Sequence, residues 1–213
     1  MLSSVTTPQD LDRRFRDAVG ALATAPGRQA AGALRRSDPH ASRDPAAPVR
    51  EGGRLTGKRA FELFDAQLTS RHLDLAARWL RGFGEGFYTI GSSGHEGNAA
   101  VAAALAPTDP ALLHYRSGAF YCARAARAHA GSPTGADAIV DPARDVLRGV
   151  VASTLEPIAG GRHKVFGHPD LHIIPTTSTI ASHLPRAVGL AFALSRHGRV
   201  RSSRPDEVSE LPW

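Results

Sequence analysis

The most regular pattern of apolar and polar positions lies between residues 57 and 82. Large apolar side chains recur there every three or four positions, so they share one face of a helix. This spacing predicts a long amphipathic helix that begins near Gly57. His72 falls within the apolar face, and the sequence favours a buried, hydrogen-bonded position for it in the core. The face consists of Phe61, Phe64, Leu68, His72, Leu75 and Trp79.

Three shorter helices follow in the predicted order. Ser93 and Glu96 have the spacing of a capping box, which predicts an alanine-rich helix over residues 98–105. A second helix is predicted over residues 118–129. Asp141 stands ahead of a proline and predicts the start of a third helix, because Asp is favoured at the N-cap and proline at the first helical position.

Only two short segments have the apolar run expected of buried strands, residues 112–116 and residues 171–174. The polar residues 176–179 then supply an N-cap for a last amphipathic helix, predicted over residues 180–196. Its apolar face consists of Ile180, Leu184, Val188, Ala191 and Phe192. The pattern as a whole predicts an α/β fold that is dominated by helices and has few strands.

The two ends of the chain differ from this middle region. Residues 1–50 are predicted to form a flexible arm rich in Ala, Arg and Pro, because their few apolar side chains cannot offset the entropy lost on ordering. A possible short helix within the arm is indicated by Leu11, Phe15, Val19 and Leu22. Residues 197–213 are charged and aperiodic, and we expect an irregular tail there. The folded domain is therefore predicted over residues 51–196.

Composition narrows the class of protein. The chain has 213 residues, with 26 Lys and Arg against 20 Asp and Glu and a net charge of +6, which suits one domain. The basic residues are scattered among acids, whereas nucleic-acid binders cluster them on one face, so we expect no nucleic-acid partner. Binding of nucleic acid by the arginine-rich arm is the alternative.

Cys122 is the only cysteine, which excludes an internal disulfide. No apolar run approaches the roughly 20 residues that span a bilayer, and we expect a cytoplasmic protein without membrane association.

Several familiar catalytic motifs are missing from the sequence. It has neither the Gly-x-Gly-x-x-Gly nor the Gly-x-x-x-x-Gly-Lys-Ser/Thr phosphate loop, and residues 91–94 do not have the spacing of a hydrolase nucleophile elbow. Three histidines lie close together, but in a Gly- and Pro-containing loop without the spacing of a tight metal site. Contact with substrate or solvent is the alternative role for them. They are His163, His168 and His172.

The best candidate for ligand binding is the pair Tyr115 and Arg116. The pair comes at the end of a predicted buried strand, which is where open α/β sheets bind their ligands. An Arg guanidinium donates two hydrogen bonds to phosphate oxygens, and a Tyr hydroxyl donates one. The sequence therefore favours an anion site, with a structural ion pair between Arg116 and a carboxylate as the alternative. His95 with Glu96 would suit an acid/base pair, although capping already accounts for Glu96.

Three segments, taken in order, resemble one family. They are Leu68-Thr69-Ser70-Arg71, the block from Gly94-His95-Glu96-Gly97 through Pro107-Thr108-Asp109 to Tyr115-Arg116, and the stretch from Ser178 to Gly189. Together they resemble the α part of the thiamine-diphosphate-dependent decarboxylating component of 2-oxo acid dehydrogenases, of the branched-chain type in particular. The resemblance covers about residues 55–192. It implies an incomplete thiamine-diphosphate-binding, transketolase-like domain.

The resemblance also implies roles for particular residues. In the family a Tyr-Arg pair holds the diphosphate of the cofactor, and the matching residues here are Tyr115 and Arg116. A Ser-x-hydrophobic element lines the thiamine, and the matching residues are Ser178 and Ile180. A β-branched side chain is stiff, which suits a wedge that holds the two thiamine rings at an angle.

Other ligands that the family uses are altered or missing. Potassium binds in the same stretch of the family, where Thr177 and Ser182 would serve, but His183 stands where a Gln is usual. None of the 21 glycines precedes an Asp, so the Gly-Asp-Gly or Gly-Asp-Ala segment that holds Mg²⁺ in the family does not occur. No catalytic residue can be assigned. The guesses for the mouth of the site are Phe87, Tyr88 and His163.

Two hypotheses result. In the first, the chain is the N-terminal part of a 2-oxo acid dehydrogenase that oxidatively decarboxylates a branched-chain 2-oxo acid or pyruvate and passes the acyl group to a lipoyl-bearing acyltransferase. Because the metal-binding segment and the β region are missing, we expect the chain to form oligomers, to bind thiamine diphosphate weakly and to be inactive alone. In the second, it is a non-catalytic truncated product or assembly module that pairs with another subunit through uncovered helices.

Overall fold

The computed structural model describes residues 7–24, 44–86, 90–129, 140–156, 158 and 166–203. The chain divides into two compact units, residues 1–47 and residues 48–213, and each is described by itself. Most of the predicted flexible arm, residues 25–43, lies outside the described residues, as do residues 204–213 of the predicted tail.

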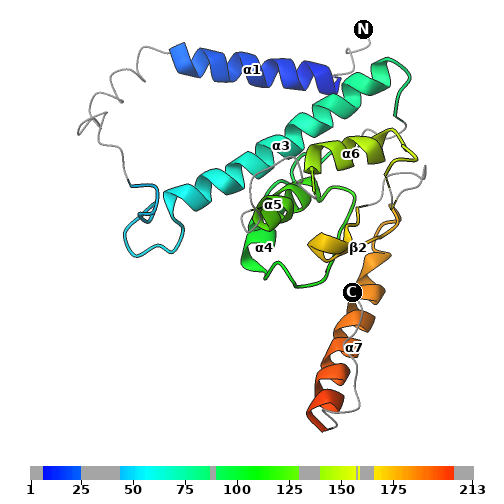
Figure 1. The fold of residues 1–213 in the computed structure, drawn as a ribbon. Helices are drawn as coiled ribbons and strands as arrows, with labels where there is room; N and C mark the ends of the chain where they lie inside the picture. The colour runs from blue at the N-terminus through cyan, green and yellow to red at the C-terminus, as the bar shows by residue number, and fades with distance from the viewer. Residues whose placement is uncertain are drawn as a thin grey trace. The chain divides into compact units, whose positions relative to one another are not determined.

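The first unit contains α1 (Pro8–Thr24), at the position of the short helix predicted from the N-terminal apolar series (Figure 1). Two reciprocal hydrogen bonds close its first turn. The Thr7 N–H donates to Asp10 Oδ2 at 3.0 Å, and the Asp10 N–H donates to Thr7 Oγ1 at 3.2 Å. This is a capping-box arrangement with Asp in place of the usual Glu. Local capping therefore defines the start of this helix, on which Phe15 is exposed.

The second unit consists mainly of helices and contains a small parallel sheet (Figure 1). Strands β1 (Ala111–Leu112) and β2 (Ile173–Ile174) pair in parallel, with Ala111 opposite Ile173. The predicted helix-dominated α/β fold with few strands is confirmed at this level. The other elements are α3 (Gly57–Gly82), α4 (Asn98–Ala104), α5 (Gly118–His129), α6 (Pro142–Val150), the 3-10 turn η1 (Pro169–Leu171) and α7 (His183–Ser203).

The helix starts agree with the predicted caps at one position and differ at another. Asp141 caps α6 as predicted, because its carboxylate accepts hydrogen bonds from the N–H groups of Ala143 and Arg144. The N-cap of α4 is Gly97 and makes no side-chain hydrogen bond, so the predicted capping role of Ser93 is wrong. The Glu96 carboxylate contacts the Gly94 N–H and the Arg71 side chain instead.

Helix α5 lies at the centre of the core. Every residue from Gly118 to Ala125 is buried, and the helix packs against α3, α4 and α6. Small residues allow a close approach, since a Cβ added to Gly118 would lie 2.6 Å from the Ser70 Oγ of α3. A helix that is buried all round is the expected centre of a core. The same core cluster contains Leu73, Leu113, Phe166, Leu171 and Ile173.

Two arginines of α5 supply hydrogen bonds to carbonyl groups of neighbouring segments. NH1 of the fully buried Arg124 lies 2.7 Å from the Pro107 carbonyl oxygen and 3.2 Å from that of Leu171. NH1 of Arg127 lies 2.6 Å from the Leu105 carbonyl oxygen, just beyond the C-terminal end of α4. Carbonyl groups at a helix end have no partner within the helix, so these arginines fasten the segments around β1 to α5.

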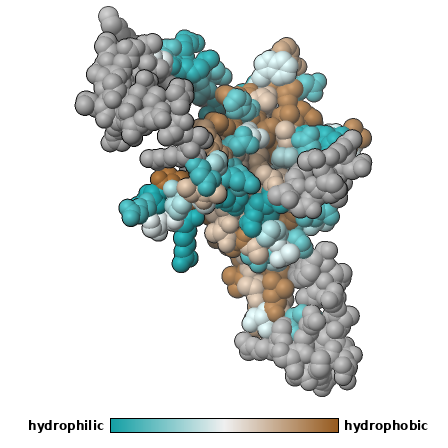
Figure 2. All heavy atoms as spheres, turned by 60° about the vertical axis from the view of Figure 1, so that its left-hand side comes forward, coloured by the Kyte–Doolittle hydropathy of each residue, from teal (hydrophilic) through white to brown (hydrophobic). Residues whose placement is uncertain are grey.

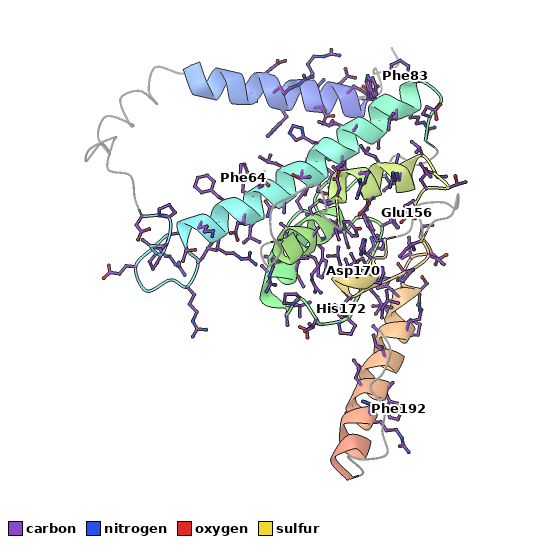
Figure 3. All side chains as sticks on the ribbon, viewed as in Figure 1. Phe64, Phe83, Glu156, Asp170, His172 and Phe192 are labelled. Atoms are coloured by element: carbon purple, nitrogen blue, oxygen red, sulfur yellow. The ribbon has the colours of Figure 1, made fainter. Side chains whose placement is uncertain are left out.

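Helix α3 confirms the predicted long helix but turns a different face to the core. Its buried side chains are Ala66, Ser70, Leu73 and Ala77. The predicted apolar face points to solvent instead, with Phe61 75% and Trp79 64% exposed. Phe64 projects from α3 on the side away from α5 (Figure 3). The buried position predicted for His72 is also wrong, because His72 is exposed. Close contact with α5 admits mostly small side chains, which explains the choice of face.

Helix α7 extends from the end of the sheet (Figure 1). It begins at His183, so Ile180 precedes it in a turn, and it continues past Arg196, where the sequence predicted its end. None of the side chains described on α7, over residues 183–197, is buried. Hydrophobic side chains of this unit consequently reach the molecular surface, where they are drawn brown in Figure 2. Within the described part of the chain, no helix combines the length and the apolar character needed to cross a bilayer.

Candidate functional site

The two segments predicted to bind a ligand leave the same edge of the sheet. Residues 113–116 follow the carboxyl end of β1, and residues 175–182 follow the carboxyl end of β2, which runs parallel to it. The Thr176 hydroxyl, which is buried, donates to the Leu113 carbonyl oxygen at 2.7 Å and joins the two segments. β1 is shorter than predicted, so Tyr115 and Arg116 stand in the turn before α5. This edge is where parallel sheets place ligands.

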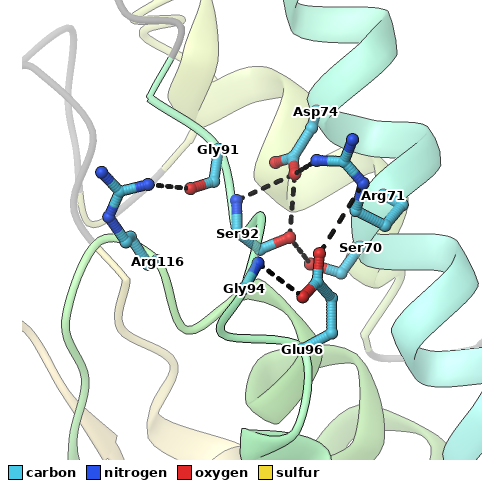
Figure 4. Close-up of polar contacts among 8 residues, drawn as sticks. All are labelled: Ser70, Arg71, Asp74, Gly91, Ser92, Gly94, Glu96 and Arg116. Atoms are coloured by element: carbon cyan, nitrogen blue, oxygen red, sulfur yellow. Dashed lines mark hydrogen bonds and ion pairs between the residues drawn. The ribbon is translucent and has the colours of Figure 1, made fainter. Parts of the chain in front are cut away.

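Arg116 is held by main-chain and ring contacts. Its NH1 donates to the Gly91 carbonyl oxygen at 2.7 Å (Figure 4). Its guanidinium carbon lies 5.6 Å from the centre of the Tyr115 ring, within the range of a cation–π contact. No ion pair joins Arg116 to a carboxylate in the part of the chain that the structure describes. The alternative of a structural ion pair is therefore not observed, and the guanidinium charge is not neutralised by a protein group there.

Three histidines gather beside this pair. The His114 ring centre lies 3.8 Å from that of Tyr115, 6.3 Å from that of His95 and 6.0 Å from that of His183. The Arg116 N–H also donates to His114 Nδ1, at 3.3 Å. Partial burial lowers the pKa of His114, and the neighbouring His183, His95 and Arg116 lower it further. The site is thus rich in groups that carry or accept positive charge.

The sequence analysis missed this histidine cluster. His95, His114 and His183 come from three segments that are far apart along the chain: the loop before α4, the turn after β1 and the first residue of α7. No local spacing could indicate that they meet. The only sequence signal was indirect, since each lies within or beside one of the segments that carry the family resemblance.

The segment before α7 brings together the two hydroxyls predicted for potassium. Thr177 Oγ1 and Ser182 Oγ lie 3.1 Å apart, and the Ser182 hydroxyl donates to the Thr179 carbonyl oxygen at 2.9 Å. Ala181, between them, adopts a left-handed backbone conformation with a φ of 64°, which is unfavourable for residues other than glycine. The turn is therefore held by its own hydroxyl groups.

The two residues predicted to line thiamine lie in the same turn. Ser178 is half-buried, whereas Ile180 is 74% exposed. Neither makes a hydrogen bond or ring contact with Tyr115 or Arg116. Among the described contacts, the one that brings the segment after β2 close to the Tyr115 segment at the level of rings is that of His183 with His114, at 6.0 Å.

A polar network supports the loop that carries His95 (Figure 4). Asp74 Oδ2 accepts hydrogen bonds from the N–H and the hydroxyl of Ser92, each at 2.8 Å, and from Arg71 NH1 at 3.0 Å. Ser70 Oγ donates to Ser92 Oγ at 2.8 Å. Both serines are buried, so their polar groups need these partners.

The outer end of this network includes the Glu96 carboxylate. Its Oε2 accepts from the Gly94 N–H at 2.8 Å, and its Oε1 lies 3.6 Å from Arg71 Nε. These two contacts engage the Glu96 carboxylate, in place of the helix capping that the sequence predicted for it, and a pairing with His95 as acid and base is not observed. Gly91 must be a glycine here, because an added Cβ would overlap the Asp74 carboxylate.

Other reactive groups of the described residues do not form a competing site. Burial raises the pKa of the Cys122 thiol to about 12, so it is not a thiolate nucleophile at neutral pH. His168 Nδ1 lies 3.8 Å from Asp170 Oδ2, a pairing of loop side chains. Three of the residues singled out from the sequence lie outside the described residues, namely Phe87, Tyr88 and His163.

The donors at this edge suit an anion better than a magnesium ion. A guanidinium, a phenol and three imidazoles are the groups that bind phosphate oxygens. Magnesium requires several oxygen ligands in near-octahedral geometry. Over the described ranges, no three His, Cys, Asp or Glu side chains are grouped so that they could hold a metal ion.

Comparison of the chain with protein-family models, with curated proteins and with solved structures gave no match. The resemblance to the 2-oxo acid dehydrogenases therefore rests on the residues quoted above. The geometry adds a guanidinium and three histidine rings that gather at the sheet edge where those residues lie.

Proposed function

We propose that the second unit is part of a thiamine-diphosphate-binding domain of a 2-oxo acid dehydrogenase. The observation that carries the proposal is the cluster of Tyr115, Arg116 and three histidines beyond the carboxyl end of β1. The Arg116 charge suits an anionic ligand. By sequence, Tyr115 and Arg116 match the Tyr-Arg pair of the family that the chain resembles. The parent reaction is the oxidative decarboxylation of a branched-chain 2-oxo acid or pyruvate, with the acyl group passed to a lipoyl-bearing acyltransferase.

In this proposal the diphosphate is the group that the cluster binds. Arg116 donates to its oxygens, the Tyr115 hydroxyl donates one further bond, and His114 with its two neighbours gains positive charge as the anion approaches. The bond from Arg116 to Gly91 fixes the guanidinium before the ligand arrives, which lowers the entropy cost of binding. Thiamine diphosphate, when bound, supplies the electron sink needed to release carbon dioxide from a 2-oxo acid.

The segment before α7 has a supporting role in the proposal. Ser178 lines the thiamine, Ile180 serves as the stiff apolar wedge, and the paired hydroxyls of Thr177 and Ser182 hold the turn or a potassium ion. Ile180 is exposed in the free chain, so it is accessible to a ligand or to another subunit. The magnesium ligands and the β region would come from elsewhere, and the cytoplasm is the compartment that fits this chemistry.

Titration calorimetry with thiamine diphosphate, with and without magnesium, tests the proposal. We expect weak binding that needs the diphosphate, so that thiamine itself binds at least about tenfold less tightly, a difference of about 1.4 kcal/mol. Arg116→Gln should abolish binding, while the matched surface variant Arg54→Gln should leave it unchanged. Neither pyruvate nor 3-methyl-2-oxobutanoate should be decarboxylated by the chain alone.

Two results would contradict this function. Equal affinity for thiamine and thiamine diphosphate would show that the cationic cluster does not recognise the diphosphate. Unchanged binding in a folded Arg116→Gln variant, with the helical circular dichroism of the parent, would place the ligand elsewhere. Micromolar affinity with turnover of either 2-oxo acid would overturn the expected inactivity of the isolated chain.

The second candidate function is that of a non-catalytic assembly module. The observation that favours it is the exposure of apolar side chains on two helices of the second unit, which a soluble monomer ordinarily covers. Association without any affinity for thiamine diphosphate would support this candidate over the first.

A further inference from the structure

The solvent-facing side of α3 carries an apolar stripe that is separate from the candidate site. We call it the outer stripe and define it as Phe61, Phe64, Leu68, His72, Leu75 and Trp79. Their exposure is high for apolar side chains, from 41% for Leu68 to 75% for Phe61. On a helix of 3.6 residues per turn, these positions lie opposite the buried Ala66, Ser70, Leu73 and Ala77. α3 therefore has two contact faces, of which the core uses one.

The positions of the outer stripe along the helix are nearly symmetric about residue 70. Phe61 and Trp79 lie equally far from residue 70, as do Leu68 and His72. Phe64 and Leu75 are symmetric about the same point to within one residue. A two-fold contact between identical chains requires a surface that is complementary to itself. Two antiparallel α3 helices that cross at residue 70 meet this requirement.

The antiparallel pairing also matches large side chains with large ones. Phe61 of one copy lies opposite Trp79 of the other at both ends of the contact. Phe64 lies opposite Leu75, and Leu68 lies opposite His72 near the axis. The pairing covers about 27 Å of helix, from the rise of about 1.5 Å per residue, and removes most of the exposed apolar side chains of α3 from water.

A polar contact supports the same arrangement. Asp65 is exposed and lies on the edge of the stripe that also carries His72. In the antiparallel pair, Asp65 of one copy comes within about one helical turn of His72 of the other, and the contact occurs twice by symmetry. Arg71 flanks the opposite edge near the axis, but Asp74 at 3.0 Å and Glu96 at 3.6 Å already pair with it within the chain, which limits repulsion between the copies.

We propose that a second copy of this chain covers the outer stripe, through an antiparallel contact between two α3 helices with its two-fold axis near residue 70. The proposal does not depend on thiamine diphosphate, because the candidate site lies elsewhere in the unit. The core face of α3 remains in contact with α5 in each copy, so the contact requires no rearrangement of the fold.

Analytical ultracentrifugation of the full chain over a range of concentrations tests the contact. A reversible monomer–dimer equilibrium is expected. Leu68→Glu places a charge near the axis and should raise the dissociation constant by about a hundredfold or more, since it buries an unpaired carboxylate. The matched variants Leu155→Glu and Leu184→Glu introduce the same charge at exposed leucines off the stripe and should leave the equilibrium unchanged.

Cysteine cross-linking tests the orientation. A mixture of Phe61→Cys chains and Trp79→Cys chains should form an intermolecular disulfide under mild oxidation, while Phe61→Cys chains alone should not. The native Cys122 is buried and does not compete.

Several outcomes would overturn the proposal. They are a wild-type chain that stays monomeric at every concentration, a dimer that Leu184→Glu breaks and Leu68→Glu does not, and cross-linking of Phe61→Cys chains to one another. A monomeric chain would leave the stripe to a different protein, and sensitivity only to Leu184→Glu would place the contact on α7. Thiamine diphosphate binding measured on the same Leu68→Glu variant should be unaffected, which keeps the two proposals separable.

Discussion

Helices α5 and α7 both carry several apolar side chains but have opposite environments. In α5 every residue from 118 to 125 is buried, whereas no side chain described on α7 is buried. α5 has small residues at the points where its neighbours cross, including Gly118, Ala119 and Ala125. α7 has a periodic row of larger residues, but only β1 lies against it among the described elements. Apolar periodicity thus defines a helix, and its burial depends on which neighbours can reach it.

The sharpest test of this contrast compares two phenylalanines, one on each helix. Phe120 of α5 is 5% exposed, and Phe192 of α7 is 67% exposed. Phe120→Ala should lower the free energy of unfolding by about 3–5 kcal/mol, because it leaves a cavity in the core. Phe192→Ala should change it by about 0.5 kcal/mol or less. Urea unfolding followed by circular dichroism measures both. Equal losses would mean that another element covers α7 in solution.

A second test compares two glycines at either end of the loop beside α3. Gly91→Ala forces a Cβ against the Asp74 carboxylate, whereas a Cβ at Gly97 meets nothing within 4 Å. Gly91→Ala should cost about 1–3 kcal/mol by overpacking. Gly97 has a right-handed helical conformation, so alanine there should be neutral or slightly stabilising. If Gly91→Ala proves harmless in thermal unfolding, the polar network around Asp74 does not hold this loop.

A third test concerns the joint between the packed helices and α7. Thr176→Val keeps the shape of a buried side chain but removes the hydrogen bond to the Leu113 carbonyl oxygen. The expected loss is about 1 kcal/mol, since a buried carbonyl then lacks its partner. The exposed Thr179 provides the control, because Thr179→Val should be close to neutral. Comparable effects at both positions would indicate that the hydrogen bond is not what joins the segments.

The smallest expected effect is a pH dependence at His114. Its pKa in the folded chain lies below the ordinary 6.5, so the unfolded chain binds the proton more readily. The contribution of His114 to stability is therefore present above pH 6.5 and is lost as the pH falls below that value. His114→Gln should flatten the pH dependence of the unfolding midpoint in this range. A steeper pH dependence of the unfolding midpoint in the variant would contradict the lowered pKa of His114.

Binding of a diphosphate should reverse the direction of the His114 pKa shift. A diphosphate beside His114 favours the protonated imidazole and raises its pKa, so binding should take up protons below neutral pH. Calorimetry in buffers of different ionisation enthalpy measures that uptake. His183→Gln offers a matched comparison, because it removes a neighbouring imidazole from the same cluster without altering β1.

Local signals predicted much of the secondary structure. Asp141 and Pro142 specified the start of α6, and the apolar series at the N-terminus specified α1, because caps and spacing act within a few residues. The predicted cap at Ser93 was wrong for a local reason. Its spacing to Glu96 is that of a capping box, but the Glu96 carboxylate accepts from the Gly94 N–H. The end of α7 was also misjudged, because charged residues past Arg196 are compatible with a solvent-facing helix.

The site was predicted only in part. Tyr115 and Arg116 could be found from their place after an apolar run, and the geometry places histidine rings beside them. The histidine cluster and the network of Asp74 with two serines could not be found, because their members come from separate segments. Whether Ser178 and Ile180 take part depends on a ligand or partner that reaches their turn.

By itself, the amino-acid sequence determined where the helices form, how α6 begins and which pair could hold an anion, since these depend on neighbours within a few positions. The tertiary structure alone decided which face of α3 is buried, because α5 approaches so closely that small side chains fit and Phe61 or Trp79 would not. It also brought His95, His114 and His183 together, because the parallel pairing of β1 and β2 places the segments of His114 and His183 at one edge and the loop held by Asp74 places His95 beside them.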